Sequence, residues 1–84
     1  MTEIKRGEAV IFLEDYNLFD TNVRDQEGMF YKYSTIDGKC LVYVSSVEEW
    51  AEPTLDSIKQ KKPGHVPRKY ANLCKRIREL RITA

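Results

Sequence analysis

Lysine and arginine side chains dominate residues 58–84 and are the groups best suited to do chemistry in this chain. Their charged ends bind phosphate oxygens, and each such contact releases counterions from a nucleic acid and adds salt-dependent affinity. We therefore expect a nucleic-acid-binding surface made of Lys59, Lys61, Lys62, Arg68, Lys69, Lys75, Arg76 and Arg78. Tyr43 and Phe30, beside Lys32, are expected to add a stacking surface for unpaired bases.

The charges of the chain are divided between two opposed segments. Residues 1–57 hold twelve acidic and five basic side chains, a net charge of −7, whereas residues 58–84 hold nine basic and one acidic, a net charge of +8. Such a division favours the binding of a polyanion by the basic segment, but it also fits two segments that neutralise each other. The whole chain has a formal net charge of +1, less basic than most nucleic-acid-binding domains.

A group of carboxylates gives the alternative hypothesis. We expect them on one exposed helix face, where they would meet the basic surface of a protein partner. The group consists of Glu48, Glu49, Glu52 and Asp56. On this interpretation the chain is a protein-binding adaptor or inhibitor, such as a bacterial or phage accessory factor that docks on a larger machine. A homodimer is a third alternative.

Catalytic and metal-binding patterns are missing from the sequence. The soft metal ligands are Cys40, His65 and Cys74, and their spacing is not that of a zinc site. Arg24 stands where a calcium loop beginning at Asp20 would need an oxygen ligand. A lone histidine in a turn is a weak candidate for a general base, and no phosphate-binding glycine loop or nucleophile motif occurs. We expect no enzyme activity, no cofactor and no metal.

Length and composition predict one small domain spanning residues 1–84. Hydrophobic residues make up 42% of the chain and aromatic residues 11%, proportions typical of a folded domain. No apolar run approaches the roughly 18 residues that a membrane span needs, and Met1 leads into charged residues rather than a signal peptide. The two cysteines are expected to be reduced thiols in the core. We therefore expect a cytoplasmic protein without a membrane partner.

Residues 1–45 are predicted to be mainly β. Residues 9–13 are apolar on both faces, which is typical of a strand covered by layers on both sides. Residues 29–36 and 39–44 predict a hairpin, because Asp37 and Gly38 between them favour a type I′ turn. A two-residue turn would pair Tyr33 with Val42. It would put Tyr31, Tyr33, Cys40, Val42 and Val44 on the core face, and Phe30, Lys32, Ser34, Leu41 and Tyr43 on a mixed face.

Residues 46–84 are predicted to be mainly α. Ser46 and Glu49 have the spacing of a capping box, which predicts a short helix up to Glu52. Residues 54–61 are a second helix candidate. The last helix, which Pro67 can open, is the clearest, because its apolar residues recur at helical spacing and its basic residues fill the remaining arc. The apolar stripe consists of Tyr70, Leu73, Cys74, Ile77 and Leu80.

Residues 64–70, Gly-His-Val-Pro-Arg-Lys-Tyr, resemble the closing segment of SH3 domains. There a Gly–x–aliphatic–Pro–x–x–Tyr run contributes to a proline-binding groove. No tryptophan pair precedes the segment and a helical period follows Tyr70, so the resemblance transfers no function to this chain. Strand content alone keeps a small SH3-like barrel as an alternative shape for residues 5–45.

These patterns together predict an α+β fold. A small twisted antiparallel sheet of three or more strands would carry C-terminal helices on one face. The expected core consists of Val10, Phe12, Tyr31, Tyr33, Val42, Val44, Trp50, Leu55, Ile58, Tyr70, Leu73, Ile77 and Leu80. The leading functional hypothesis is a non-enzymatic binding module whose basic C-terminal helix engages RNA or DNA without strong sequence reading.

Overall fold

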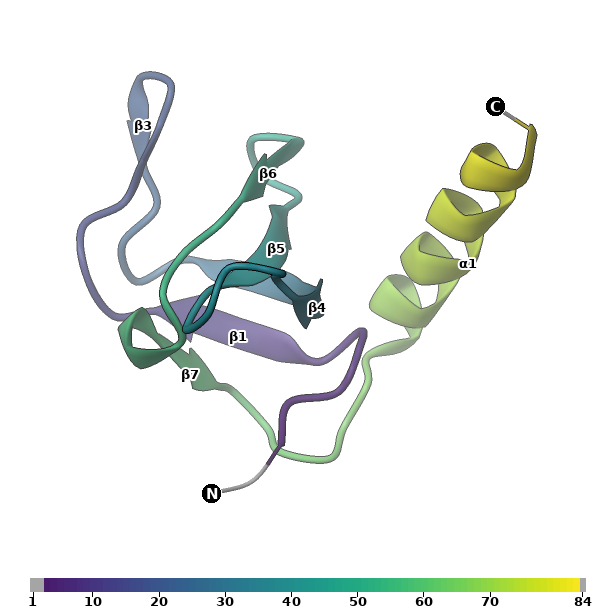
Figure 1. The fold of residues 1–84 in the computed structure, drawn as a ribbon, viewed down its shortest axis with the longest axis horizontal. Helices are drawn as coiled ribbons and strands as arrows, with labels where there is room; N and C mark the ends of the chain where they lie inside the picture. The colour runs from purple at the N-terminus through teal and green to yellow at the C-terminus, as the bar shows by residue number, and fades with distance from the viewer. Residues whose placement is uncertain (1–2, 84) are drawn as a thin grey trace.

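A curved antiparallel sheet and one long helix make up the fold (Figure 1). The computed structural model describes residues 3–83, with side chains up to residue 79. Five strands form the main sheet in the order β6-β5-β4-β1-β7, and β2 pairs with β3 in a separate hairpin. In chain order the elements are β1 (Ala9–Phe12), β2 (Asn17–Leu18), β3 (Thr21–Asn22), β4 (Glu27–Tyr33), β5 (Cys40–Val44), β6 (Glu49–Ala51), η1 (Leu55–Ser57), β7 (Ile58–Gln60) and α1 (Arg68–Thr83). The predicted α+β architecture is confirmed.

The inner face of the sheet holds the larger hydrophobic core. All five strands contribute buried side chains to it, and Leu18 and Val23 from the β2–β3 region close one end. The edge strands β6 and β7, each of three residues, contribute Ala51 and Ile58 to the same core. Within residues 3–83 these two edges do not pair with each other, so the sheet curls around its core without closing into a barrel.

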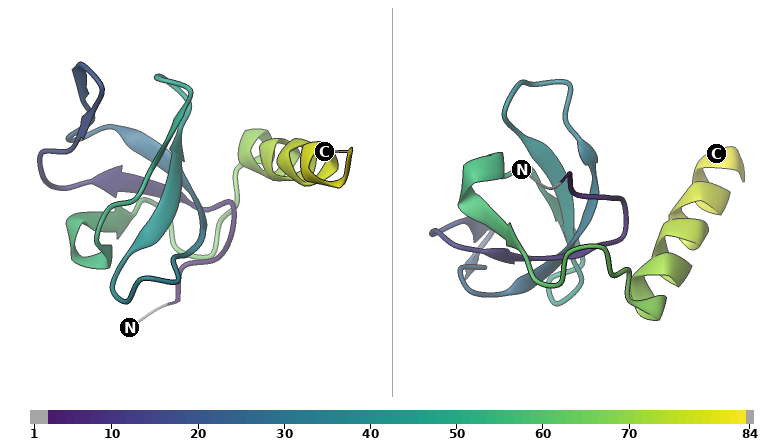
Figure 2. Two further views of the ribbon diagram at one scale, coloured as in Figure 1. Left: turned by 45° about the horizontal axis from the view of Figure 1, so that its top comes forward. Right: turned by 90° about the horizontal axis from the view of Figure 1, so that it is seen from below.

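Helix α1 covers part of the opposite face of the sheet, which we call the outer face. Tyr70 from the first turn of α1 forms a second buried cluster with Ala9, Met29 and Tyr31. Val10 and Phe12 point into the inner core, so β1 is covered on both sides, as its sequence predicts. Figure 2 shows α1 alongside the sheet at the end of an extended connection. No helix among residues 3–83 is long and apolar enough to cross a membrane.

The β4–β5 hairpin forms, but its register differs from the predicted one. Tyr33 pairs with Cys40 rather than Val42, and the connection spans residues 34–39. The Ser34 hydroxyl accepts a hydrogen bond from the Ile36 backbone N–H at 3.1 Å, which turns the chain before the expected two-residue loop. Of the two turn residues, only Gly38 has a positive φ, so the turn is not type I′.

A β-bulge in β4 exchanges the expected faces of two aromatic residues. The register shifts between Phe30 and Lys32, which leaves Tyr31 as the extra residue opposite β5. Phe30 therefore enters the inner core with 1% of its surface exposed, whereas Tyr31 packs on the outer face beneath α1. The bulge thus places the Tyr31 ring on the outer face, where α1 packs against it.

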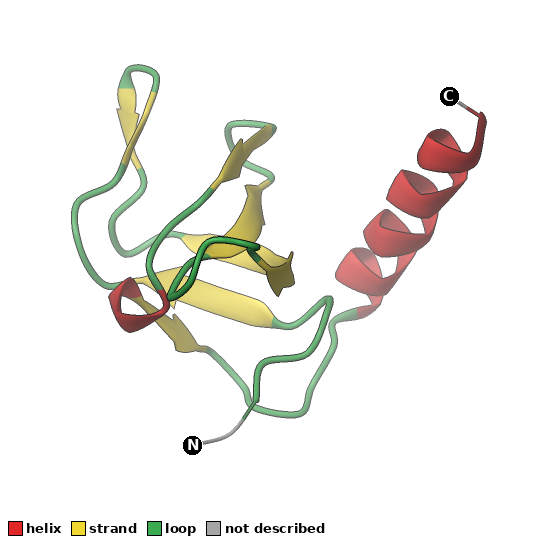
Figure 3. Ribbon diagram, viewed as in Figure 1, coloured by secondary structure: helices red, strands yellow, loops and turns green. Residues whose placement is uncertain are grey.

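The prediction of two short helices between residues 46 and 61 is wrong. Residues 45–48 form a turn, β6 follows, and residues 55–57 make a single 3-10 turn before β7 (Figure 3). The strand places Ala51 inward and Trp50 outward, an alternation that outweighs the capping-box pattern. The segment of residues 64–70 that resembles SH3 domains lies in the β7–α1 connection and the first turn of α1, outside the sheet.

Most residues of the expected core are buried or half-buried, but two of them are exposed. Tyr33 and Trp50 remain 42% and 40% exposed. Leu55, Leu73 and Ile77 are half-buried at the margins of the two clusters. The side chain of Leu80 lies outside the described residues. The sequence interpretation omitted the fully buried side chains of Val23, Met29 and Phe30, whereas Cys40 is buried as expected.

A buried carboxylate, that of Glu8, ties the β7–α1 connection to the N-terminal loop. Glu8 is 1% exposed and accepts hydrogen bonds from the backbone N–H groups of Lys5 and Gly64 and from the Gln60 side chain. Burial alone would raise the pKa of Glu8, but the hydrogen bonds outweigh it and lower the pKa. The carboxylate therefore stays charged while it holds three segments together.

Replacing Gly28 with alanine should destabilise the fold by about 1–3 kcal/mol, the usual cost of overpacking a core. A Cβ atom at this position would lie 2.4 Å from Cγ1 of Val42 and 3.3 Å from Cε1 of Phe12. Urea denaturation would give the change in the free energy of unfolding. Combining Gly28→Ala with Val42→Ala removes the nearest overlap, so the double variant should lose less than the sum of the single losses. Strictly additive losses would contradict this steric explanation.

Candidate nucleic-acid interface

Helix α1 presents its cations to solvent because its apolar residues lie along one side. Tyr70 is buried, and Leu73, Cys74 and Ile77 are half-buried against the outer face of the sheet. The remaining arc of the helix faces away from the sheet. It carries the exposed side chains of Arg68 and Lys75. The exposed side chains of Arg76 and Arg78 lie at its margins, where they line hollows beside the sheet. Half of the eight expected cations therefore share one helix surface.

Lys61 and Lys69 converge on one carboxylate, that of Glu27 at the start of β4. Lys61 Nζ lies 2.9 Å from Oε1 and Lys69 Nζ lies 3.2 Å from Oε2, and the Tyr70 hydroxyl also donates a hydrogen bond to Oε2. Partial burial by itself would raise the pKa of Glu27, but these three partners lower it to about 2. Burial and the same hydrogen bond raise the pKa of Tyr70.

Glu27 neutralises part of the charge of Lys61 and Lys69. Within residues 3–78, the salt bridges of the expected cations are the two that these lysines make with Glu27. Both lysines still expose more than half of their side-chain surface, 58% and 67%. Lys62 lines a hollow of about 370 Å³ beside them, and Lys59 is exposed on the edge strand β7. The connection and the helix therefore form one continuous basic surface, with Lys59 at its margin.

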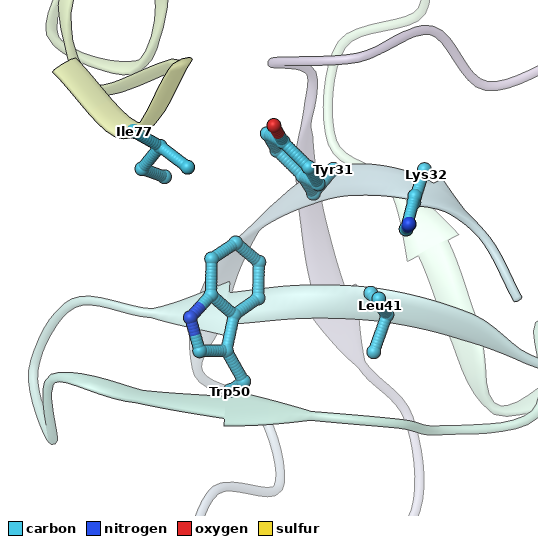
Figure 4. A pocket seen from close by; sticks show the side chains of 5 residues that line it. All are labelled: Tyr31, Lys32, Leu41, Trp50 and Ile77. Atoms are coloured by element: carbon cyan, nitrogen blue, oxygen red, sulfur yellow. The ribbon is translucent and has the colours of Figure 1, made fainter. Parts of the chain in front are cut away.

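A groove of about 370 Å³ lies between α1 and the outer face of the sheet (Figure 4). Its lining consists of Tyr31, Lys32, Leu41, Trp50 and Ile77. Ile77 points from the helix toward the rings of Tyr31 and Trp50, which rise from the sheet. The Trp50 indole meets the rings of Tyr31 and Tyr43 edge-on, with centroids 5.2 and 5.1 Å apart. This packing fixes the indole while 40% of Trp50 stays exposed.

A second hollow of about 550 Å³ shares part of its lining with the groove and is mainly basic. Lys5, Arg6 and Arg78 line it, together with one acidic residue, Glu3. Arg6 is held in place there, because its Nε donates a hydrogen bond of 3.0 Å to the carbonyl oxygen of Tyr31. Its guanidinium also lies 4.5 Å from the centroid of the Tyr31 ring, a cation–π contact.

Sequence reasoning missed the residues that the fold adds to this surface. Lys5 and Arg6 belong to the acidic segment of the sequence, so their linear context hides their position near the basic helix. Lys32, which the sequence places beside the expected stacking residues, lines the same hollow. The prediction that Phe30 is a stacking residue is wrong, because its side chain is buried in the inner core. Trp50 occupies an accessible position instead. The alternation of Trp50 with the small residue Ala51 was the signal that could have identified it.

The expected acidic face does not form, because residues 48–56 are not a helix. Glu48 is exposed in the turn before β6, and Asp56 is exposed on the 3-10 turn. Glu49 and Glu52 are half-buried, and Glu52 accepts a hydrogen bond of 2.9 Å from the Ser34 hydroxyl. The four carboxylates are therefore spread over a turn, a strand, the loop after that strand and a 3-10 turn rather than along one helix face.

The two cysteines are free, with Cys40 in the inner core and Cys74 half-buried on the side of α1 that packs against the sheet. Burial raises the pKa of Cys40 to about 11, with a smaller contribution from the charge of Glu52. Burial also raises the pKa of Cys74. Both thiols therefore stay protonated at neutral pH, which makes them poor nucleophiles. Among the described residues, no cluster of three or more histidine, cysteine or acidic side chains is placed to hold a metal ion.

Replacing Glu27 with glutamine should remove part of the acid sensitivity of the fold. The pKa of Glu27 is lowered in the folded state, so its stabilisation is present above the ordinary value of 4.5 and is lost as the pH falls toward about 2. Urea titrations should show the natural chain more stable than the variant near pH 7, with a difference that shrinks below 4.5. Asp15→Asn, which breaks an exposed pair with Arg24, should change stability little. A difference between the natural chain and Glu27→Gln that does not vary with pH would contradict this assignment.

Comparison of the chain with protein-family models, with curated proteins and with solved structures finds no match, so the geometry described above is the basis for assigning a function.

Proposed function

We propose that this chain is a non-enzymatic binding module that engages RNA or DNA through the exposed cations of α1 and of the β7–α1 connection. One observation carries the proposal. The apolar stripe of α1 is turned toward the sheet, while Arg68, Lys75, Arg76 and Arg78 are exposed. We place the module in the cytoplasm, a setting supported by its two free cysteines.

Electrostatics favour a polymer of phosphates as the ligand. The cations follow the length of the helix and continue into Lys61 and Lys62, which suits successive phosphates along a strand rather than one small anion. Within residues 3–78, the salt bridges of the expected cations are the two that Lys61 and Lys69 make with Glu27, and both lysines stay more than half exposed. Contacts to phosphates alone carry no sequence information. Binding should therefore be tolerant of sequence.

A protein-binding adaptor remains the second candidate, with a smaller surface than the sequence suggests. Exposed carboxylates at Glu48 and Asp56 could meet a basic partner, but Glu49 and Glu52 are half-buried. A homodimer through the mixed face of the hairpin would compete with α1, which already packs beside Tyr43 on that side. Charge reversal at Glu48 and Asp56 that abolishes a pull-down would favour the adaptor over the nucleic-acid module.

The double variant Lys75→Gln and Arg76→Gln should weaken binding of short labelled RNA and DNA in fluorescence anisotropy. Each lost phosphate contact reduces the slope of log affinity against log salt by about 0.7 for single strands, so a reduction of about 1.4 is expected. The control Arg24→Gln with Lys39→Gln removes the same charge from the β half of the chain and should leave the slope unchanged. Equal losses in both double variants, or no salt dependence in the natural chain, would overturn the proposal.

A further inference from the structure

We propose that the groove between α1 and the outer face of the sheet receives an unpaired base of single-stranded nucleic acid, with Trp50 as the stacking platform. This inference rests on the proposed function and narrows it from nucleic acids in general to single strands. It assigns a role to an exposed aromatic surface that phosphate binding does not use. The groove residues come from β4, β5, β6 and α1, so the site exists only in the folded chain.

The aromatic rings at the groove have a fixed arrangement. Trp50 is the single tryptophan of the chain, and it stands on a three-residue edge strand with 40% of its surface exposed. Edge-on contacts with Tyr31 and Tyr43 hold the indole in one orientation, so little side-chain entropy remains to be lost on binding. Indole rings stack on every base because all bases have a π-face.

The groove has a suitable size and apolar walls. Its volume of about 370 Å³ lies within the range of small-ligand sites, and Leu41 and Ile77 close its sides with aliphatic groups. Figure 4 shows Ile77 of α1 facing the Trp50 indole across the opening. A planar base entering here would lie between an aromatic ring and aliphatic side chains. Such surroundings suit a base taken out of a stack.

Basic side chains lie beside the groove. Lys32 lines both the groove and the adjoining hollow, where Arg6 and Arg78 supply two more cations. Phosphates on one side of a bound base would meet these side chains, with Glu3 as the acidic residue in the same hollow. The exposed cations of α1 continue from Arg78 along the helix, so the strand that carries the base can follow them.

Duplexes do not fit this arrangement. Paired bases are stacked within the helix and expose only their edges, so a duplex can offer the basic surface its phosphates but cannot insert a base into the groove. Single strands can do both at once. The shared chemistry is an unpaired base beside phosphates, which single-stranded RNA and DNA both supply.

The experiment compares a short single strand with a duplex of the same length, using the full chain and the fluorescence of Trp50. Single-stranded RNA or DNA should quench this fluorescence, whereas the duplex should bind with little quenching. Trp50→Ala should weaken single-strand binding in anisotropy about ten-fold, Trp50→Phe should weaken it less, and neither should change duplex binding. Ile36→Ala, which removes an exposed aliphatic group in the β4–β5 connection, serves as the control and should bind like the natural chain.

The outcomes separate this inference from the proposed function. Salt-dependent binding of both nucleic acids with equal affinity, unchanged in Trp50→Ala, would leave the basic surface in place and overturn the groove assignment. Absence of binding to either nucleic acid would overturn both. Equal quenching by polyglutamate would show that the groove takes acidic peptides, and would overturn the assignment to bases. Thermal unfolding of Trp50→Ala and Trp50→Phe must match the natural chain, and loss of binding that follows loss of fold in both would count against the stacking role.

Discussion

The attachment of α1 to the sheet is the constraint on which the rest of this structure depends. Among the described side chains of the helix, the buried one is Tyr70, which packs into the outer face and donates a hydrogen bond from its hydroxyl to the carboxylate of Glu27. The first turn of α1 contains no acidic residue and begins with Arg68 and Lys69, an arrangement that the helix dipole disfavours. Glu27 supplies the missing negative charge from a neighbouring strand. Glu8 fixes the connection that precedes the helix.

Those two carboxylates explain how a chain with opposed charged segments folds without losing its basic surface. Within residues 3–78, the salt bridges between the acidic and the basic half are those of Glu27 with Lys61 and Lys69, whereas Glu8 contacts the basic half through neutral donors of Gln60 and Gly64. Partly buried groups with several partners hold their geometry better than exposed pairs such as Arg24 and Asp15. Most cations of α1 thus remain on the surface. Lys5, Arg6 and Lys32 from the other half lie near them.

The sequence predicted an element correctly where one local hydrophobic pattern determines that element. The strand of β1 and the helix α1 follow from apolar residues at strand and helix spacing, and both are present. The prediction of helices in residues 46–61 was wrong because a capping-box pattern is short and local. The pairing of β6 with β5 and of β7 with β1 depends instead on residues distant in the sequence. The predicted register of the hairpin was wrong for a related reason, since no local sequence pattern indicates the bulge at Tyr31. The groove could not be predicted, because it needs that bulge, the outward Trp50 and the docked helix together.

The short edges of the open sheet have a consequence for the molecule in a crowded setting. A sheet that curls without closing exposes unpaired backbone groups on its two outermost strands, and such groups are templates for joining one chain to another. Here β6 and β7 are three residues each, and Lys59 places a charge in the middle of β7. Copies of the chain at high concentration would repel each other through this lysine instead of joining edge to edge. The fold can therefore remain an open sheet and still tolerate high local concentration.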